Sequence, residues 1–317
     1  MRAQRYFNEK GADNMARSDM QPVHIKRDNR FFTALIYVIV IAFAIICVAP
    51  FLMMLGGSFM LEDDIRTYGY RIIPTNFSTF AYETLFMFPD RIINGYKNTV
   101  LVTIIGSFGH LIVCSLCGYP LAVKTVKYRR IFQAYIIITL VLSGGMVSWY
   151  YVCTKILKLR NSMFSMILPL LVSPFNIFLI RNYYMGLPEE LAESATIDGA
   201  GQLRIYAQII LPLSKPVLAT VALFISINYW NDWYNSLMLN DLPEYFSLQL
   251  ILRTVVSQIQ FLRTNTYAAG MKELLENLPG EGVKLATAMV TVGPIIAIYP
   301  FIQKYFVKGI TVGAVKG

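Results

Sequence analysis

Six stretches of this chain contain no Asp, Glu, Lys or Arg, and they constrain the fold more than any other feature. They are Phe31–Met60, Asn98–Val123, Ile131–Thr154, Asn161–Ile180, Pro216–Asn231 and Leu285–Gln303. Five of them have at least 19 residues, enough to cross a bilayer as an α-helix. The fifth in order has only 16, but it continues beyond Asp232 from Trp233 to Asn240, so an interfacial aspartate near one end is acceptable. With 56% hydrophobic residues, the sequence predicts an all-α integral membrane protein with six transmembrane helices.

The distribution of charge predicts the orientation in the membrane. If both termini lie in the cytoplasm, the inner segments are 1–30, 124–130, 181–215 and 304–317. These segments carry 17 Lys and Arg against 8 acidic residues, whereas the outer segments carry 11 of each. The net charge of +9 therefore lies on one side, as the positive-inside rule requires. The basic character is a topology signal and does not predict a nucleic-acid partner.

The predicted organisation has three parts. Residues 1–30 are polar and lack apolar periodicity, which indicates a loose cytoplasmic arm. Residues 31–303 form the six-span domain, and residues 304–317 form a short basic cytoplasmic tail. The first apolar run is too long for a signal-peptide core and has no small-residue cleavage site, so it is expected to remain as a helix.

Leu187 to Pro216 is the longest polar-containing insert in the second half that still has helical character. Pro188 suits the first helical position, and Glu189 and Glu190 follow in the first turn, where carboxylates complement the helix dipole. Asp198-Gly199 breaks this helix, with Gly199 as the left-handed glycine after its end.

A second helix is expected from about Gly201 or Gln202 to Pro212. Its predicted apolar stripe consists of Leu203, Tyr206, Ala207, Ile210 and Leu211. On the first helix Ala192, Ala195 and Gly199 form a line of small residues that would allow close approach to another surface. Local chemistry leaves two interpretations open, a hairpin packed on its own protein and a docking element for a partner.

Aromatic and amide residues gather at the end of the fifth run. The sequence Tyr229-Trp230-Asn231-Asp232-Trp233-Tyr234 combines rings, amides and a carboxylate, as sugar sites do. An aromatic belt at the membrane surface explains the same residues and is favoured over sugar contact. The candidate residues of a substrate path are Asn176, Asn228, Tyr229, Trp230, Asn231, Asp232 and Trp233.

No catalytic or nucleotide-binding motif occurs. The chain lacks a phosphate loop, H-E-x-x-H and G-x-S-x-G, so a partner must supply any ATP hydrolysis. Cys114 and Cys117 form a C-x-x-C inside an apolar run without further ligands, and cysteine there is expected to act as a small apolar residue. His110 is expected to be a packing group rather than a proton relay. We predict no catalytic residue, no metal site and no cofactor in this chain.

The hairpin carries a specific resemblance. Glu193-Ser194-Ala195, three residues, Gly199, nine residues, Ile209, one residue and Leu211-Pro212 resembles the EAA motif of bacterial ABC importer permeases, with Ser194 replacing an alanine. The flanking Pro188-Glu189-Glu190-Leu191 and the C-terminal Tyr299-Pro300-Phe301 are similar to the carbohydrate branch. Residues 30–317 resemble MalG-like second permeases, most of all the LplC/YtcP type of oligosaccharide importers.

The resemblance implies the partners and the coupling residues. They would be a homologous MalF-like permease, two cytoplasmic ABC ATPases that bind ATP and Mg, and an extracellular or periplasmic solute-binding protein, all at the bacterial cell membrane. The implied ATPase-coupling residues are Glu189, Glu190, Glu193, Ser194, Ala195, Asp198, Gly199, Ile209, Leu211 and Pro212. The tail residues Val315, Lys316 and Gly317 would form a second ATPase contact.

Two alternatives stay open. The same architecture could import a different solute. A stand-alone secondary carrier or channel is a different class, but such carriers normally need ionisable groups near the midplane, and the only carboxylate within the spans is Asp232 at an edge.

Overall fold

The computed structural model describes residues 30–87, 89–264, 280–294 and 296 of the chain. It divides into two compact units, Met1–Met53 and Met54–Gly317, which we describe separately. Of the predicted cytoplasmic arm, only Arg30 is among the described residues. The predicted tail, with Val315, Lys316 and Gly317, lies outside them.

The first unit contains most of one long helix, α2 (Arg30–Ser58), which runs on into the second unit. The helix continues through Pro50 and ends at Ser58, directly after Gly56 and Gly57. Between Phe32 and Met53 nearly every side chain is exposed, as expected for a helix whose apolar surface is covered by lipid or by a partner.

The second unit is helical in its described part, with one isolated β-bridge between Met60 and Phe77. Its elements are α3 (Glu62–Tyr68), α4 (Phe80–Leu85), α5 (Pro89–Ala122), α6 (Arg129–Val141), α7 (Gly145–Tyr151), η2 (Val152–Ile156), α8 (Phe164–Ile167), η3 (Leu168–Leu170), α9 (Pro174–Met185), α10 (Glu189–Ile197), α11 (Gln202–Ile205), η4 (Tyr206–Ile210), α12 (Leu211–Leu213), α13 (Lys215–Trp230), α14 (Tyr234–Leu239), η5 (Pro243–Tyr245) and α15 (Leu248–Thr264). A further helix covers residues 280–294.

Two helices among the described residues are long and apolar enough to cross a membrane, Phe32–Ser58 and Pro89–Ala122. Three bent pairs would raise this number to five if each pair is one span. The pairs are Arg129–Val141 with Gly145–Ile156, Phe164–Leu170 with Pro174–Met185, and Gln202–Leu213 with Lys215–Trp230, bent by 115°, 51° and 77°. The last predicted run, Leu285–Gln303, extends beyond the described residues.

Two predicted runs, the third and the fourth, are therefore broken helices, and the fifth is shorter than expected. The third run breaks at residues 142–144, and Gly145 directly after the break has a φ of +76°. In the fourth run Pro174 starts α9 afresh behind the N-cap Ser173, because proline cannot continue the preceding helix. The fifth run was expected to continue to Asn240 as one span. Instead α13 ends at Trp230 and α14 is a separate helix.

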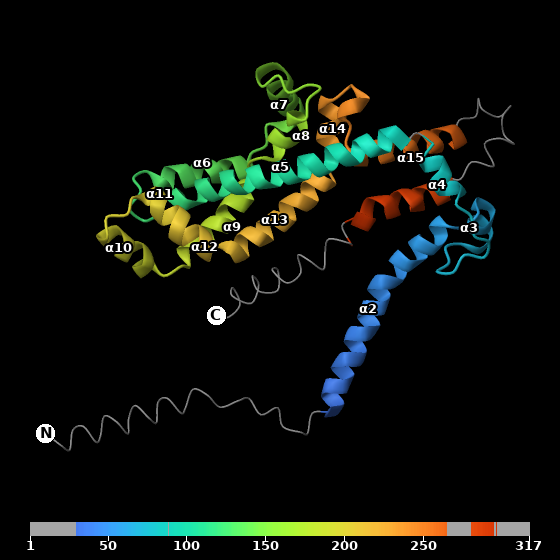
Figure 1. Cartoon of the computed structure of the whole chain (residues 1–317), viewed down its shortest axis with the longest axis horizontal. Helices are drawn as coiled ribbons and strands as arrows, with labels where there is room; N and C mark the ends of the chain where they lie inside the picture. Colours follow the sequence, from blue (N-terminus) through green and yellow to red (C-terminus); the bar gives the residue numbers. More distant parts are fainter. Residues whose placement is uncertain (1–29, 88, 265–279, 295, 297–317) are drawn as a thin grey trace. The chain divides into compact units, whose positions relative to one another are not determined.

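Helix α5 is the axis of the second unit, and α9, α13 and α15 pack along it (Figure 1). Glycine residues on α5 allow the neighbouring helices to approach it closely. A Cβ atom built on Gly106 would lie 2.5 Å from the ring of Tyr229, and one on Gly118 would lie 3.3 Å from the Ile177 carbonyl oxygen. Three apolar clusters follow α5 from end to end, the outermost two centred on Leu248 and on Ile180.

A buried carboxylate fixes the start of the last helix. The Glu62 Oε2 atom accepts hydrogen bonds from the backbone N–H groups of Glu281 and Gly282 at 3.0 and 3.2 Å. Those N–H groups lie in the first turn of the 280–294 helix, where they have no partner within the helix and favour a negative charge. The cap therefore joins α3 to this last helix.

Candidate functional site

The loop 187–214 forms a helical hairpin at the end of α5 that carries Ala122 (Figure 1). Its first arm, α10, starts at Glu189, and Pro188 lies at the N-cap rather than at the first helical position. At the other end Gly199 has a φ of +80°, the left-handed conformation that was expected. The Gly199 N–H donates to the Thr196 carbonyl oxygen at 3.0 Å and the Ala200 N–H donates to that of Ala195 at 2.9 Å. This pair of bonds is a Schellman motif, which satisfies carbonyls at the helix end.

The second arm differs from the predicted stripe. Its middle, Tyr206–Ile210, is a π-helical turn. A π turn has more residues than an α turn, so a stripe counted at 3.6 residues per turn drifts off the buried face. Tyr206 and Ile210 of the predicted stripe are buried, as is Ile205 outside it, whereas Ala207 is exposed and Leu203 is 77% exposed. The arm also runs past Pro212 to Leu213, and the sharp bend falls at Ser214.

The hairpin is fastened to α5 by hydroxyl groups. The Ser115 Oγ atom lies 2.7 Å from the Tyr184 hydroxyl oxygen and 2.6 Å from the Tyr206 hydroxyl oxygen, and all three residues are buried. These residues come from α5, α9 and η4. We call them the hydroxyl triad.

Two contacts nearer the surface support the same attachment. The Tyr119 hydroxyl donates to the Gln202 Oε1 atom at 2.9 Å, and Tyr119 packs its ring against Tyr206. Lys124, just after α5, forms an ion pair with Glu189 in the first turn of α10. Because both charged side chains are more than half exposed, this pair adds little stability.

The predicted coupling residues are thereby divided between two faces. Ala195 and Ile209 are half-buried and pack against the apolar cluster that contains Ile180, as does Ala192 of the small-residue line. The outward residues are Glu189, Glu190, Glu193, Ser194, Asp198, Gly199 and Pro212. Leu211 is half-buried.

The exposed tip of the hairpin is apolar as well as acidic. Ile197, next to the glycine turn, is 87% exposed, and Leu203 on the other arm is 77% exposed. Leu191 is also exposed. Large apolar side chains grouped on a protruding turn are typical of a surface that a partner covers. Between this hairpin and the end of α5 lies a groove of about 540 Å³ whose walls include Tyr119, Glu193 and Ile205.

At the C-terminal end of α13, the aromatic residues are buried and the asparagines beside them are exposed. Tyr229 is buried, with its hydroxyl donating to the Ile167 carbonyl oxygen at 2.8 Å. Trp230 is also buried, and its Nε1–H donates to the Thr291 carbonyl oxygen at 3.1 Å. The polar atoms of these two rings are therefore used within the chain. Asn228 and Asn231 lie on the exposed face of α13.

The remaining path candidates also have structural contacts. Asp232 accepts hydrogen bonds from the backbone and side-chain N–H groups of Asn235 at 3.0 and 2.8 Å, which fixes the start of α14. Asn176 is buried, and its Nδ2 atom lies 2.9 Å from the His110 Nε2 atom. His110 Nδ1 lies 2.8 Å from the Leu170 carbonyl oxygen. His110 therefore bridges α5 to the broken α8–α9 segment, the packing role expected of it.

The cysteines behave as expected for apolar residues. Cys114 is buried with its Sγ atom 3.4 Å from His110 Nε2, whereas Cys117 is exposed. Within the described ranges no group of three or more His, Cys, Asp or Glu side chains is arranged to hold a metal ion.

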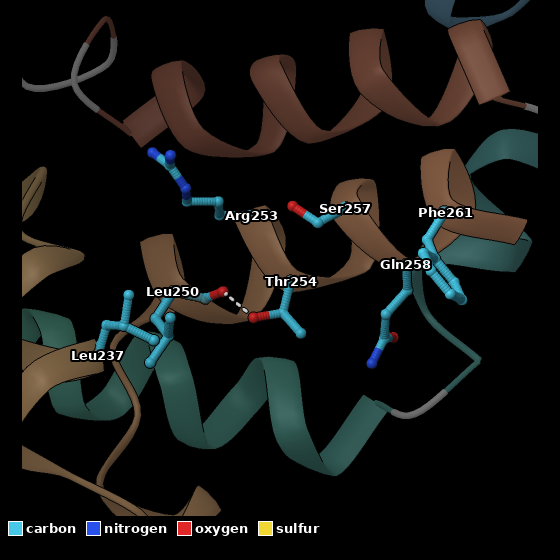
Figure 2. Close-up of a pocket in the computed structure, with 7 residues that line it drawn as sticks. All are labelled: Leu237, Leu250, Arg253, Thr254, Ser257, Gln258 and Phe261. Carbon is cyan, nitrogen blue, oxygen red and sulfur yellow. Dashed lines mark hydrogen bonds between the residues drawn. The ribbon is translucent and has the colours of Figure 1, made fainter. Parts of the chain in front are cut away.

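Sequence reasoning missed the hydroxyl triad and a groove on α15. Ser115 lies in an apolar run and its two tyrosine partners are far apart in sequence, so no spacing reveals them. The groove has a volume of about 690 Å³ and is lined by Leu237 of α14 and by Leu250, Arg253, Thr254, Ser257, Gln258 and Phe261 of α15 (Figure 2). The residues of α15 recur at helical spacing on one face, a signal that the sequence does contain.

Comparison with known proteins gives the family. The chain is 36% identical over 275 residues to protein LplC of Bacillus subtilis strain 168, covering 86% of this chain and 90% of the relative. It is 35% identical over 292 residues to the polygalacturonan/rhamnogalacturonan transport system permease protein YtcP of the same strain, covering 91% and 99%. The chain belongs to the permease subunits of bacterial sugar ABC importers.

A solved structure agrees with this assignment. A chain of a bacterial ABC transporter involved in the import of the acidic polysaccharide alginate superimposes on this permease with a TM-score of 0.72 and 28% identity. The match covers 90% of this permease and all of that chain. No family model matches the chain. Permeases of this kind are non-catalytic components of the cell membrane, as expected here.

Proposed function

We propose that this permease forms half of the path by which an ATP-driven importer carries an oligosaccharide, and that hairpin 187–212 couples it to the ATPase. The exposed apolar tip at Ile197 and Leu203 is the observation that carries this proposal. It protrudes from a hairpin fixed by the buried hydroxyl triad, so a force applied to the tip reaches α5 and α9. The spacing from Glu193 to Pro212 supports an ATPase as the partner that covers the tip.

The complete importer would contain a MalF-like permease, two ABC ATPases that bind ATP and Mg, and a solute-binding protein outside. Closure of the ATPases would bring the docked hairpins together and switch the spans between inward- and outward-facing states. Six spans with both termini in the cytoplasm agree with the charge distribution and put the hairpin on the inner side. Val315, Lys316 and Gly317 remain proposed as a second ATPase contact.

The proposed substrate path runs along the exposed face of α13. Asn228 is exposed there, and exposed Asn231 and half-buried Trp233 follow just beyond the helix end. The path would also be shaped by residues whose polar atoms are bonded within the chain and which support its wall: Asn176, Tyr229, Trp230 and Asp232.

The decisive variant for coupling is Gly199→Pro. Proline fixes φ near −65° and has no N–H, so it can adopt neither the φ of +80° nor the bond to Thr196. ATP-dependent uptake and substrate-stimulated ATP hydrolysis should be lost in proteoliposomes, while the protein still inserts and assembles. The control is Gly201→Ala, where φ is −71° and no heavy atom lies within 4 Å of the added Cβ. Normal uptake by Gly199→Pro would refute the coupling role.

Purification distinguishes the alternatives. The proposal expects the ATPases and a second permease to co-purify with this chain and uptake to require ATP. A solitary protein that moves solute into vesicles without ATP would be a secondary carrier or channel. Uptake that requires ATP but accepts no saccharide would favour the same architecture with a different solute.

A further inference from the structure

Helix α15 has two distinct faces, and only one of them is used by the fold. Leu248, Ile251, Leu252 and Ile259 are buried in the apolar cluster at that end of α5. The opposite face carries Arg253, Thr254, Ser257 and Gln258, all exposed, and forms the groove of about 690 Å³ with Leu237 (Figure 2).

The groove contains an arginine held in place but not neutralised. The Arg253 Cζ atom lies 3.6 Å from the centroid of the Trp233 ring, within the range of a cation–π contact. None of the lining residues is acidic, and no ion pair within the described part of the chain involves Arg253. The nearby carboxylate of Asp232 is bonded to Asn235 instead. The guanidinium thus has its fork of donors available for an anion.

Uncharged donors accompany this charge. The Ser257 hydroxyl and the Gln258 amide have no hydrogen-bond partner among the described residues, and both lie in the groove. Thr254 donates to the Leu250 carbonyl oxygen at 2.8 Å and keeps an acceptor site free. A carboxylate is the group that a guanidinium binds with two parallel hydrogen bonds. The exposed side chains of Leu237 and Phe261 suit the C–H face of a sugar.

A hydrogen bond links the helix that carries the groove to the proposed path. Gln249, one helical turn before Arg253, donates from Nε2 to the Asn231 Oδ1 atom at 3.3 Å. Asn231 is on the exposed face of α13, so the same oligosaccharide can contact both. This link to the path favours a saccharide over an acidic side chain of a partner protein as the occupant.

We propose that this groove binds the carboxylate of an acidic saccharide, one that contains uronate units, and that Arg253 selects it over a neutral saccharide. This inference rests on the proposed function and narrows its substrate class. Arg253 would act at the outer end of the path, before the solute reaches the spans.

The test uses the assembled importer in nanodiscs without its binding protein. The probes are trigalacturonate and the same trimer with every carboxylate methyl-esterified, which differs in charge but has the same sugar chain. We expect wild type to bind the acid at least about ten-fold more tightly than the ester, as a charge-assisted hydrogen bond allows. Arg253→Gln should remove that preference, and Arg253→Lys should retain part of it.

Matched controls make the outcome specific. Arg160→Gln removes another exposed arginine, one that is paired with Asp241, and should leave the preference unchanged. Equal binding of acid and ester by wild type, or no binding of the acid, would overturn the inference even if neutral saccharides are imported with ATP. An Arg253→Gln variant that loses only stimulation by the binding protein would identify a protein-docking surface and would also overturn it. Failure to import any saccharide would instead refute the proposed function.

Discussion

Removal of the Ser115 hydroxyl is the sharpest perturbation of the hairpin attachment. In the variant Ser115→Ala, the Tyr184 and Tyr206 hydroxyls lose the partner that lies 2.7 and 2.6 Å from them. Both tyrosines are buried, so water does not readily replace the lost bonds. A buried polar group left without its partner costs about 1–3 kcal/mol, and two such groups give a loss of roughly 2–6 kcal/mol.

The loss of stability should differ between variants that remove different hydroxyls of the triad. Tyr206→Phe leaves the Ser115–Tyr184 bond intact, so its cost should be only about 1 kcal/mol. Because the residues share one network, the double variant Ser115→Ala with Tyr206→Phe should cost less than the sum of the two single changes. Tyr183→Phe is the control, since the Tyr183 hydroxyl is bonded at 3.3 Å to the Leu213 carbonyl oxygen outside the triad.

Two assays are needed. Unfolding by denaturant in detergent micelles gives the free energies of unfolding of wild type, the two single variants and the double variant. The ratio of solute imported to ATP hydrolysed in proteoliposomes reports on coupling, and it should fall in Ser115→Ala because the second arm of the hairpin loses its buried hydrogen bond to α5. Additive costs for the two single variants, together with an unchanged ratio, would refute the reasoning.

Three further predictions concern the rest of the permease. Gly106→Ala should lower the free energy of unfolding by roughly 1–3 kcal/mol, because its Cβ would meet the Tyr229 ring at 2.5 Å; unchanged denaturant unfolding would contradict this close packing. Trp230→Ala should cost roughly 3–5 kcal/mol of stability, whereas Asn228→Ala should change uptake without loss of stability; the reverse pattern would remove Asn228 from the path. The hydrogen bond from Arg160 lowers the pKa of Asp241 below its usual range, so the small stabilisation by this pair is complete at neutral pH and is lost as the pH falls through that lowered pKa. The melting temperatures of wild type and Asp241→Asn should therefore converge only below about pH 4. Convergence near neutral pH would contradict this role of Asp241.

The hairpin illustrates how far local sequence information extends. Gly199 could be placed in the left-handed conformation because a helix that ends in Asp-Gly has few other ways to satisfy its last carbonyls. The second arm could not be predicted equally well. Tyr206 in its π turn bonds to Ser115, 91 positions away in the chain, and Ile205 beside it is buried; local spacing reveals neither.

The roles of the aromatic residues at the end of α13 also could not be predicted from composition. The composition of Tyr229 to Tyr234 fits both sugar contact and an aromatic belt, since both use rings with polar edges. In the structure the ring of Tyr229 fills the space that Gly106 leaves open, and its hydroxyl bonds to Ile167. The exposed positions are the two neighbouring asparagines, Asn228 and Asn231.

The sequence by itself determined that the chain is a helical membrane protein, because runs of uncharged residues of this length are stable only when lipid or protein covers them. Its motif spacing also indicated the family, which the comparisons confirm. Only the tertiary structure decided that the apolar runs break into bent pairs, that Ser115 joins three segments, and that Arg253 lies over Trp233 with no acidic partner among the described residues. These features depend on side chains that meet across long sequence separations, and neither periodicity nor composition carries that information.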